Sequence, residues 1–134
     1  MREIKFKGYN KLNKKWYYGM LCKEYNREEI KDDYFIDDGL ATRSVEEDSV
    51  GQYTGYKDKN GIEIYEGDIV KEPTGDDGIE LDEYLVGFDE EYGLWQVYDL
   101  VDKAPMYQNG LHTAVKYQTE VVSNIYEEKL KGEK

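Results

Sequence analysis

The amino-acid sequence predicts a mainly β protein, folded as a small barrel or sandwich. Apolar and polar residues alternate with a period of two near the N-terminus, as they do in half-buried strands. Glycine and asparagine turn signals recur about every eight to twelve residues, a spacing typical of small all-β folds. The length of 134 residues is that of one domain. We therefore expect short strands joined by tight turns, with one or two short helices.

Tyrosine supplies much of the apolar surface that a core could use. Leu, Ile, Val and Phe account for only 29 of the 134 residues, whereas Tyr alone contributes 14. A tyrosine ring packs well while its hydroxyl stays hydrated, and tyrosine is enriched at protein interfaces. The tyrosines therefore fit two compatible roles, which are completing a thin core and covering an interface between copies.

Charge is unevenly distributed along the chain. The net charge is −12, which favours solubility and says little about fold. Residues 1–31 hold nine basic and four acidic residues, so the rest of the chain carries a net charge of −17. The basic segment can lie against the acidic body. It can also offer a basic face to a second copy or to another acidic partner.

Groups for nucleophilic catalysis or zinc binding are scarce. The chain has one cysteine, Cys22, and one histidine, His112, which are too few for a zinc site or a disulfide framework. No nucleophile elbow, dinucleotide-binding fingerprint or P-loop occurs in the sequence. We therefore expect no catalytic residue and no cofactor. Cys22 lies in an apolar run and is expected to be a small core residue, which fits a reducing compartment.

Acidic residues and glycines cluster in the sequence, as they do in calcium-binding loops. Loop registers built on Gly61 or Gly78 do not place acids where an EF-hand needs them. An irregular cation site around Asp76, Asp77 and Asp82 is an alternative to a solvated acidic turn. The solvated turn is the interpretation that we favour, so we expect no metal.

The N-terminal third is expected to hold a hairpin and a short helical segment. Alternation over residues 4–8 and an aromatic run over residues 16–22 predict two paired strands. Asn26–Asp33 is expected to form one or two helical turns with Ile30 facing inward. Residues 34–36 are expected to form a short strand.

The segment Gly51–Val70 carries the densest turn signals. Its sequence, GQYTGYKDKNGIEIYEGDIV, predicts a strand, a loop, a strand, a tight corner and a strand. The loop ends at Asn60-Gly61, where glycine supplies the positive φ that such turns require. The corner falls at Glu66–Asp68.

Further turn signals divide the C-terminal half. Pro73–Gly78 is expected to be a turn. Residues 85–88 and 94–100 are expected to pair as a hairpin, because turn residues separate them. A final strand is expected near residues 120–126, followed by a helical turn.

Lysines and aromatic rings gather near the N-terminus, and they define a candidate interaction surface. Hairpins that combine basic and aromatic residues can bind single-stranded nucleic acid. The acidic remainder of the chain would oppose such binding, and a solvated strand face with a lysine-rich loop is the simpler interpretation. The residues of this candidate surface are Lys5, Lys7, Lys14, Lys15, Trp16 and Tyr56.

Three segments resemble the YopX family of small phage and prophage proteins. The segment GQYTGYKDKNGIEIYEGDIV is similar to the family's central pattern, with Tyr56 where leucine is usual and Ile62 where a polar residue is usual. The opening IKFKGYNKLNKKW has Lys7 in place of a common arginine. The closing VVSNIYEEKL has Ser123 in place of a glycine and lacks the family's proline. The matches lie at both ends and in the middle, so they span the whole chain.

The resemblance implies a mostly β protein that contains an SH3-like barrel, as a single domain over residues 1–134. A hairpin over about residues 1–25 would pack on a barrel core over about residues 50–134. The family has no established catalytic residues, so none is carried over to this chain. The matching positions are expected to be structural: Tyr53, Gly55, Asp58, Asn60, Gly61, Tyr65, Glu66, Gly67, Asp68, Asn124 and Tyr126.

These observations favour a non-enzymatic phage or prophage accessory protein that acts by binding protein, most simply as a homo-oligomer. The charged N-terminus has no apolar signal segment, and no run approaches the roughly 20 apolar residues of a membrane span. We therefore expect a cytoplasmic location in the bacterial host and no membrane partner. One alternative is an acidic decoy that imitates DNA and occupies a host DNA-binding protein. A second alternative is a single-stranded nucleic-acid binder that uses the basic N-terminal hairpin.

Overall fold

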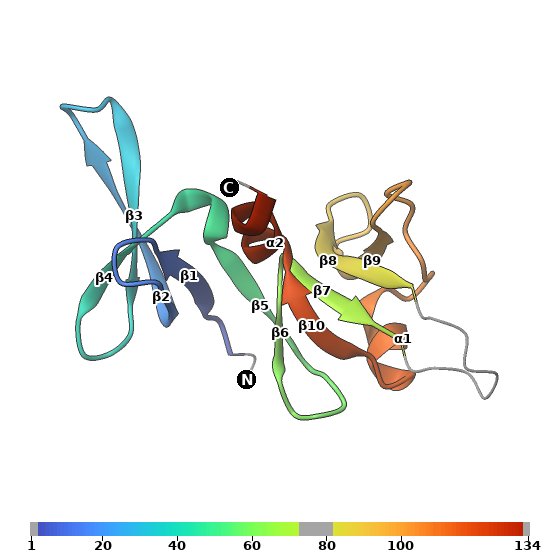
Figure 1. Ribbon diagram of the computed structural model, residues 1–134. Helices are drawn as coiled ribbons and strands as arrows, with labels where there is room; N and C mark the ends of the chain where they lie inside the picture. The colour runs from blue at the N-terminus through green and yellow to red at the C-terminus, as the bar shows by residue number, and fades with distance from the viewer. Residues whose placement is uncertain (1–2, 73–81, 133–134) are drawn as a thin grey trace. The chain divides into compact units, whose positions relative to one another are not determined.

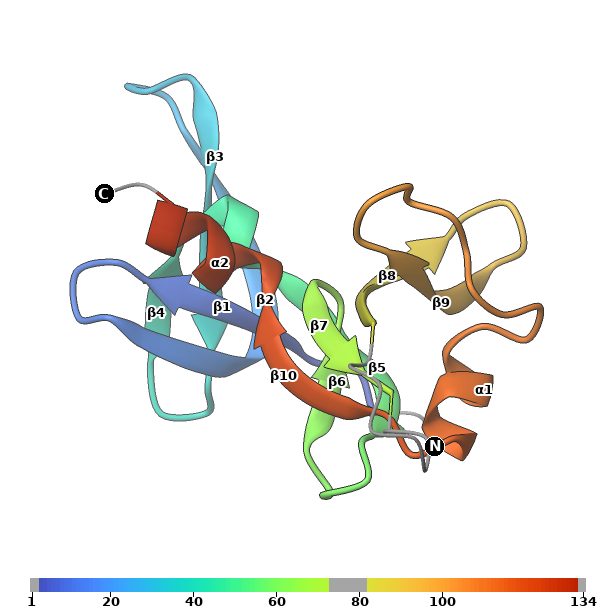
Figure 2. The ribbon, with the colours of Figure 1, turned by 45° about the vertical axis from the view of Figure 1, so that its right-hand side comes forward.

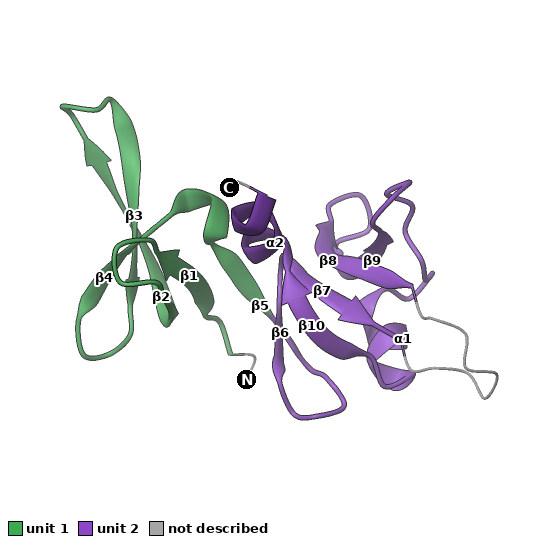
Figure 3. Ribbon diagram, in the orientation of Figure 1, with its two compact units in different colours: residues 1–53 green, residues 54–134 purple. Residues whose placement is uncertain are grey.

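The computed structural model describes residues 3–72 and 82–132, and the protein is mainly β. The chain forms two compact units, residues 1–53 (unit 1) and residues 54–134 (unit 2), coloured separately in Figure 3. Strand β5 (Gly51–Lys57) crosses from the first unit into the second. The expected turn at Pro73–Gly78 lies outside the described residues. The single domain, with a hairpin packed on a barrel core, stays a prediction.

Unit 1 is an antiparallel sheet whose strands lie in the order β4-β3-β2-β1-β5 (Figure 1). The expected pairing of the first two strands is present, with Tyr9 opposite Trp16. The elements are β1 (Phe6–Asn10), β2 (Lys15–Asn26), β3 (Lys31–Asp37), β4 (Thr42–Val45), the short 3-10 helix η1 (Glu47–Ser49) and the first part of β5.

The helical segment expected over Asn26–Asp33 was wrong. This stretch is the reversal between β2 and β3, and the Asn26 side-chain oxygen accepts hydrogen bonds from the backbone N–H groups of Glu28 (3.0 Å) and Glu29 (3.1 Å). An asparagine that bonds its own following backbone in this way stabilises a turn and competes with a helix. Ile30 ends the turn at φ 53° and is 77% exposed, so its expected inward position was also wrong.

Unit 2 holds a second antiparallel sheet, in the order β10-β7-β8-β9, and two short helices (Figure 2). The expected hairpin around Asp89–Gly93 is present, and so is the final strand followed by a helix. Among the described residues no pairing joins β9 to β10, so no closed barrel is found. The elements after β5 are β6 (Glu63–Tyr65), β7 (Asp68–Lys71), β8 (Glu83–Asp89), β9 (Leu94–Asp99), α1 (Leu111–Lys116), β10 (Glu120–Asn124) and α2 (Ile125–Gly132).

The core of unit 2 combines strand residues with two residues of a short helix, Leu111 and Ala114. Leu111 of α1 is fully buried among them, and the sequence did not indicate this helix, because its six residues are too few to show a helical period. The fully buried members of the core are Ile64, Val70, Val86, Val97, Leu111 and Ala114. No helix within residues 3–72 and 82–132 is long and apolar enough to cross a membrane.

Candidate protein-interaction site

The β2–β3 hairpin extends well beyond the strands that flank it in unit 1 (Figure 1). Strand β1 stops pairing with β2 at Gly19, whereas β2 and β3 stay paired from Met20 to the turn. We call residues 20–33 the arm. Among the described residues, no strand other than β3 pairs with the arm's part of β2. β2 therefore has an open edge along the arm. Residues 24–26 and 31–33 form a two-stranded ribbon, whereas residues 20–23 pair with the part of β3 that β4 flanks on its other side.

The arm carries apolar side chains on the surface of unit 1. Met20 is 53% exposed and Tyr25 is 55% exposed. Cys22 is also exposed, so its expected place in the core was wrong. Where the ribbon has only two strands, from residue 24 to the turn, both of its faces meet solvent, and alternation along a strand buries neither set of side chains. Ribbons of two strands are marginally stable alone, which makes this arm a natural place for a partner.

The arm is mildly acidic and carries one unfavourable pair. It holds three basic and five acidic residues, a net charge of −2. Lys23 and Asp32 form an ion pair across the strands, with Nζ 3.8 Å from Oδ2. Glu24 lies directly opposite Asp33, and like charges in that arrangement are destabilising. The amide of Asn26 donates a hydrogen bond to Asp33 at 3.1 Å, which partly offsets this repulsion.

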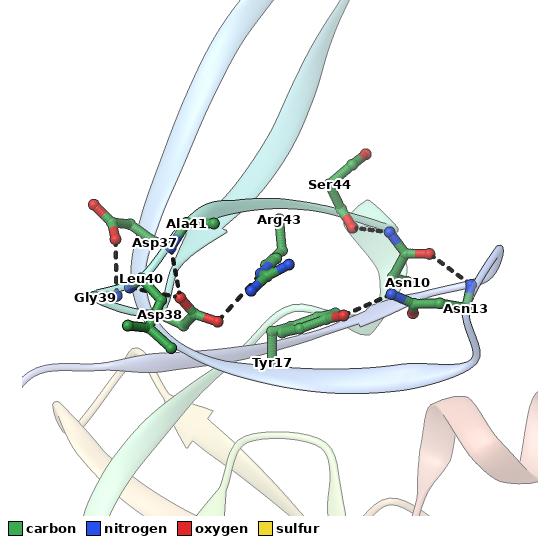
Figure 4. A network of polar contacts seen from close by, with 10 residues as sticks. All are labelled: Asn10, Asn13, Tyr17, Asp37, Asp38, Gly39, Leu40, Ala41, Arg43 and Ser44. Carbon is green, nitrogen blue, oxygen red and sulfur yellow. Dashed lines mark hydrogen bonds and ion pairs between the residues drawn. The ribbon is translucent and has the colours of Figure 1, made fainter.

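A polar network fixes the turn at the base of the arm (Figure 4). The carboxylate of Asp38 accepts hydrogen bonds from the backbone N–H groups of Ala41 and Leu40, both at 2.9 Å. Its other oxygen lies 3.2 Å from Nε of Arg43, whose guanidinium stacks 5.1 Å from the Tyr17 ring centroid. The N–H groups of Ala41 and Leu40, together with Arg43, lower the pKa of Asp38. This turn therefore holds β3 and β4 in register beside the arm.

The basic surface expected near the N-terminus is only partly present. Lys7 is 6% exposed and its Nζ lies 4.8 Å from the Trp16 ring centroid, so the expected solvent position of Lys7 was wrong. An ammonium over an aromatic face is attracted by the ring, which compensates for part of the lost hydration. Lys5 is held similarly, 2.6 Å from Glu3 and 5.1 Å from the Tyr53 ring centroid.

The remaining members of that surface lie in different places. Lys14, in the turn between β1 and β2 at φ 58°, and Lys15, the first residue of β2, are both exposed. Tyr56 lies in unit 2, where it packs against the core and its ring centroid is 6.1 Å from that of His112. The aromatic rings of the expected surface, Trp16 and Tyr56, are therefore already in contact with other side chains of the protein.

The DKNG loop of the central motif ties two distant parts of unit 2 together. Asp58 is 7% exposed, and its carboxylate accepts hydrogen bonds from the backbone N–H groups of Asn60 (2.8 Å), Ile62 (2.9 Å) and Val121 (2.9 Å). Gly61 completes the loop at φ 80° and donates its N–H to the carbonyl of Asp58. The motif thus positions the start of β10.

The EGD corner performs a similar task at the other end of β10. The N–H of Gly67 donates to the carbonyl of Val86, and the carbonyl of Gly67 accepts from the N–H of Ile125. Asp68 is buried and accepts from the N–H of Tyr65 at 2.8 Å. The remaining motif positions have no shared role in these loops: Tyr53 and Tyr126 are buried, Gly55 has φ 88°, Glu66 is exposed, and Asn124 accepts from the N–H of Glu127.

Each unit has a hollow on its described surface. The hollow in unit 2, of about 600 Å³, lies between the start of β9 and the segment Pro105–Asn109. The lining of the hollow in unit 1, of about 290 Å³, includes Tyr34, five acidic side chains and one basic side chain, Lys31. Burial, and then the charge of Glu47, raise the pKa of Tyr34, whose hydroxyl lies 3.4 Å from that carboxylate. No group of three or more potential metal ligands occurs among the described residues.

Comparison with known proteins agrees with the motif and the fold. The profile of the family described as "YopX protein" matches residues 5–130. The chain belongs to the YopX family. It is similar in structure to protein EF1440 from Enterococcus faecalis, with 17% sequence identity, a TM-score of 0.55, and coverage of 96% of this chain and 97% of that one. At this identity the likeness establishes the fold alone. No curated protein matches the chain.

Proposed function

We propose that this YopX family member is a non-enzymatic phage or prophage accessory protein that acts by binding protein in the host cytoplasm, including a second copy of itself. The arm is the observation that carries this proposal. Its open strand edge presents unsatisfied backbone donors and acceptors, and such edges are templates for pairing with another chain. Exposed Met20, Tyr25 and Ile30 add apolar surface beside that edge.

Light scattering coupled to size-exclusion chromatography tests the self-binding. The intact chain is expected to elute with a mass above that of a monomer at about 100 μM, a concentration at which even weak complexes populate. The triple variant M20D/Y25D/I30D is expected to return to a monomer. The matched control is L12D/L40D/Y92D, which adds the same charge at three exposed apolar sites outside the arm. A strictly monomeric intact chain overturns self-assembly.

A second candidate function is the acidic decoy of a DNA-binding protein. It is supported by the hollow in unit 1, where five carboxylates gather on adjoining segments: Asp32, Asp33, Glu46, Glu47 and Asp48. A decoy competes with DNA, so the protein would release a host DNA-binding protein from a DNA column. Neutralising the five carboxylates would abolish the release. Failure of the unmodified chain to compete at low salt removes this candidate.

We also propose that unit 2 is an SH3-like barrel. The antiparallel order β10-β7-β8-β9 and the single core beneath it support this assignment. An experimental structure with β10 and β9 brought together through further pairing would establish it. A sheet that stays open on both edges would contradict it.

A further inference from the structure

We propose that two copies of this chain join by antiparallel pairing of their arms along the free edge of β2, in a register centred on Cys22. The inference rests on the proposed self-binding and names its contact. In this arrangement Cys22 faces Cys22 of the second copy across a two-fold axis. The two sheets then continue into each other through main-chain hydrogen bonds, as in other cases of strand addition.

The free edge sets the limits of the contact. Gly19 is already paired with Phe6 of β1, so pairing with another chain can begin only at Met20. It can extend no further than Asn26, where the turn begins. A complex of two copies closed by a two-fold axis is the commonest symmetric oligomer, and it uses the same edge on both partners.

Symmetry restricts the possible registers. Opposed residues of an antiparallel pair point to the same face, whereas neighbours along a strand point to opposite faces. A two-fold axis perpendicular to the sheet keeps each residue on its own face. The axis must therefore pass midway between one residue and the same residue of the second copy, which lie directly opposite each other. The candidates with room for neighbours on both sides are Leu21, Cys22, Lys23 and Glu24.

Charge and length select Cys22 among these. An axis at Lys23 or at Glu24 sets identical charges directly opposite each other, which is unfavourable. An axis at Leu21 permits only a very short contact, because Gly19 is occupied by β1. An axis at Cys22 pairs residues 20–24 of both copies and brings no like charges opposite one another. In it, Met20 faces Glu24 and Leu21 faces Lys23.

Charge substitutions at position 20 test the register. Met20→Lys creates two symmetric Lys–Glu24 pairs in the Cys22 register, and Met20→Glu creates two Glu–Glu24 pairs. The dissociation constant of the dimer is therefore expected to differ between the two variants by about tenfold, with the lysine variant tighter. In the Lys23 register Met20 faces Asn26 instead, and the sign of the charge would have little effect.

Tyr25→Lys and Tyr25→Glu are the matched controls. Tyr25 is exposed to the same degree as Met20, and each lies opposite an aspartate of β3, Asp32 and Asp37 respectively. These variants change the net charge of the arm equally, but position 25 lies outside the proposed contact. Analytical ultracentrifugation of all four variants measures the dissociation constants.

The outcomes separate this inference from the proposed function. A dimer whose affinity responds to charge at position 20 more than at position 25, and which bismaleimidoethane cross-links through Cys22 but not in the Cys22→Ser variant, supports the register. A dimer that responds equally at the two positions overturns the register and leaves self-assembly in place. A chain that stays monomeric overturns self-assembly as well.

Discussion

The carboxylate of Asp58 accepts a hydrogen bond at 2.9 Å from the backbone N–H of Val121, 63 residues further along the chain. The same carboxylate closes its own loop through the N–H groups of Asn60 and Ile62. A buried carboxylate with three backbone donors joins a local turn to a distant strand in one contact. The DKNG segment of the family motif therefore has a structural role, because it joins its own loop to β10.

Removing the Asp58 carboxylate should destabilise unit 2. Asp58→Ala leaves three backbone N–H groups without their acceptor, and hydrogen bonds to a charged group contribute about 1.5–3 kcal/mol each. Allowing for solvent replacing part of these bonds, we expect the free energy of unfolding to fall by about 3 kcal/mol. Urea unfolding followed by circular dichroism measures the change. Asp102→Ala, at an exposed turn position, serves as the control, and an equal effect of both variants would contradict the role of Asp58.

Two glycines with nearly the same backbone angle should respond differently to alanine. Gly110 has φ 67° and ψ −147°, and a Cβ there would collide with the Trp95 carbonyl oxygen, which is backbone and cannot move aside. Gly61 has φ 80°, and a Cβ there meets nothing within 4 Å. Gly61→Ala should lower the free energy of unfolding by about 1–2 kcal/mol, which is the energy needed to hold a residue with a Cβ in the left-handed conformation. Gly110→Ala should cost clearly more, and equal midpoints of thermal unfolding for the two variants would refute the steric argument.

Local signals in the sequence were sufficient for most strands of unit 2. The hairpin at Asp89–Gly93 and the turn at Asn60-Gly61 were predicted because their residues determine backbone angles directly. The turn after Asn26 was not predicted, because the same residues are compatible with a helix start, and only the pairing of β2 with β3 decides between them.

The candidate site could not be located from the sequence. An apolar run around Cys22 has the same pattern whether its strand lies in a core or projects from a sheet. The run is exposed because β2 is longer than β1, so that one edge of β2 has no partner strand after Gly19 among the described residues. Strand lengths depend on pairing between segments, so no local pattern reveals an open edge.

The Asp38 turn should stabilise unit 1 only while its carboxylate is ionised. Hydrogen bonds from the N–H groups of Ala41 and Leu40, and the charge of Arg43, lower the pKa of Asp38 from its usual 3.8. A lowered pKa in the folded state adds stability that is complete above the unfolded pKa and is lost as pH falls through the folded pKa. Asp38→Asn should therefore lower the free energy of unfolding near neutral pH. The difference in this free energy between the variant and the unmodified chain should shrink as pH falls below 3.8. Denaturant unfolding at several pH values checks this, and a difference that does not vary with pH would argue against it.

Single-stranded nucleic acid should bind poorly. Lys7 is buried against Trp16, and Lys5 is paired with Glu3, so neither ring nor charge is presented freely for stacking on bases. We expect a dissociation constant above about 100 μM for a fluorescent oligonucleotide at low salt, which is weaker binding than non-specific nucleic-acid binders usually show. Fluorescence anisotropy measures it. Tighter binding that weakens steeply with salt and is lost in K14E/K15E would restore the nucleic-acid hypothesis.

Association of the arms should strengthen as salt is added. Each arm carries a net charge of −2 and each chain −12, so two copies repel each other at long range. The proposed contact between the arms places no attractive ion pair that salt would weaken, because Glu24 faces Met20 and Lys23 faces Leu21. Added salt screens the repulsion, since the Debye length shortens from about 30 Å at 0.01 M to about 10 Å at 0.1 M. The dissociation constant from sedimentation should therefore fall between these two salt concentrations. A dissociation constant that rises instead would mean that opposite charges hold the copies together, which would point to the exposed Lys14 and Lys15 on one copy and the acidic hollow of unit 1 on the other.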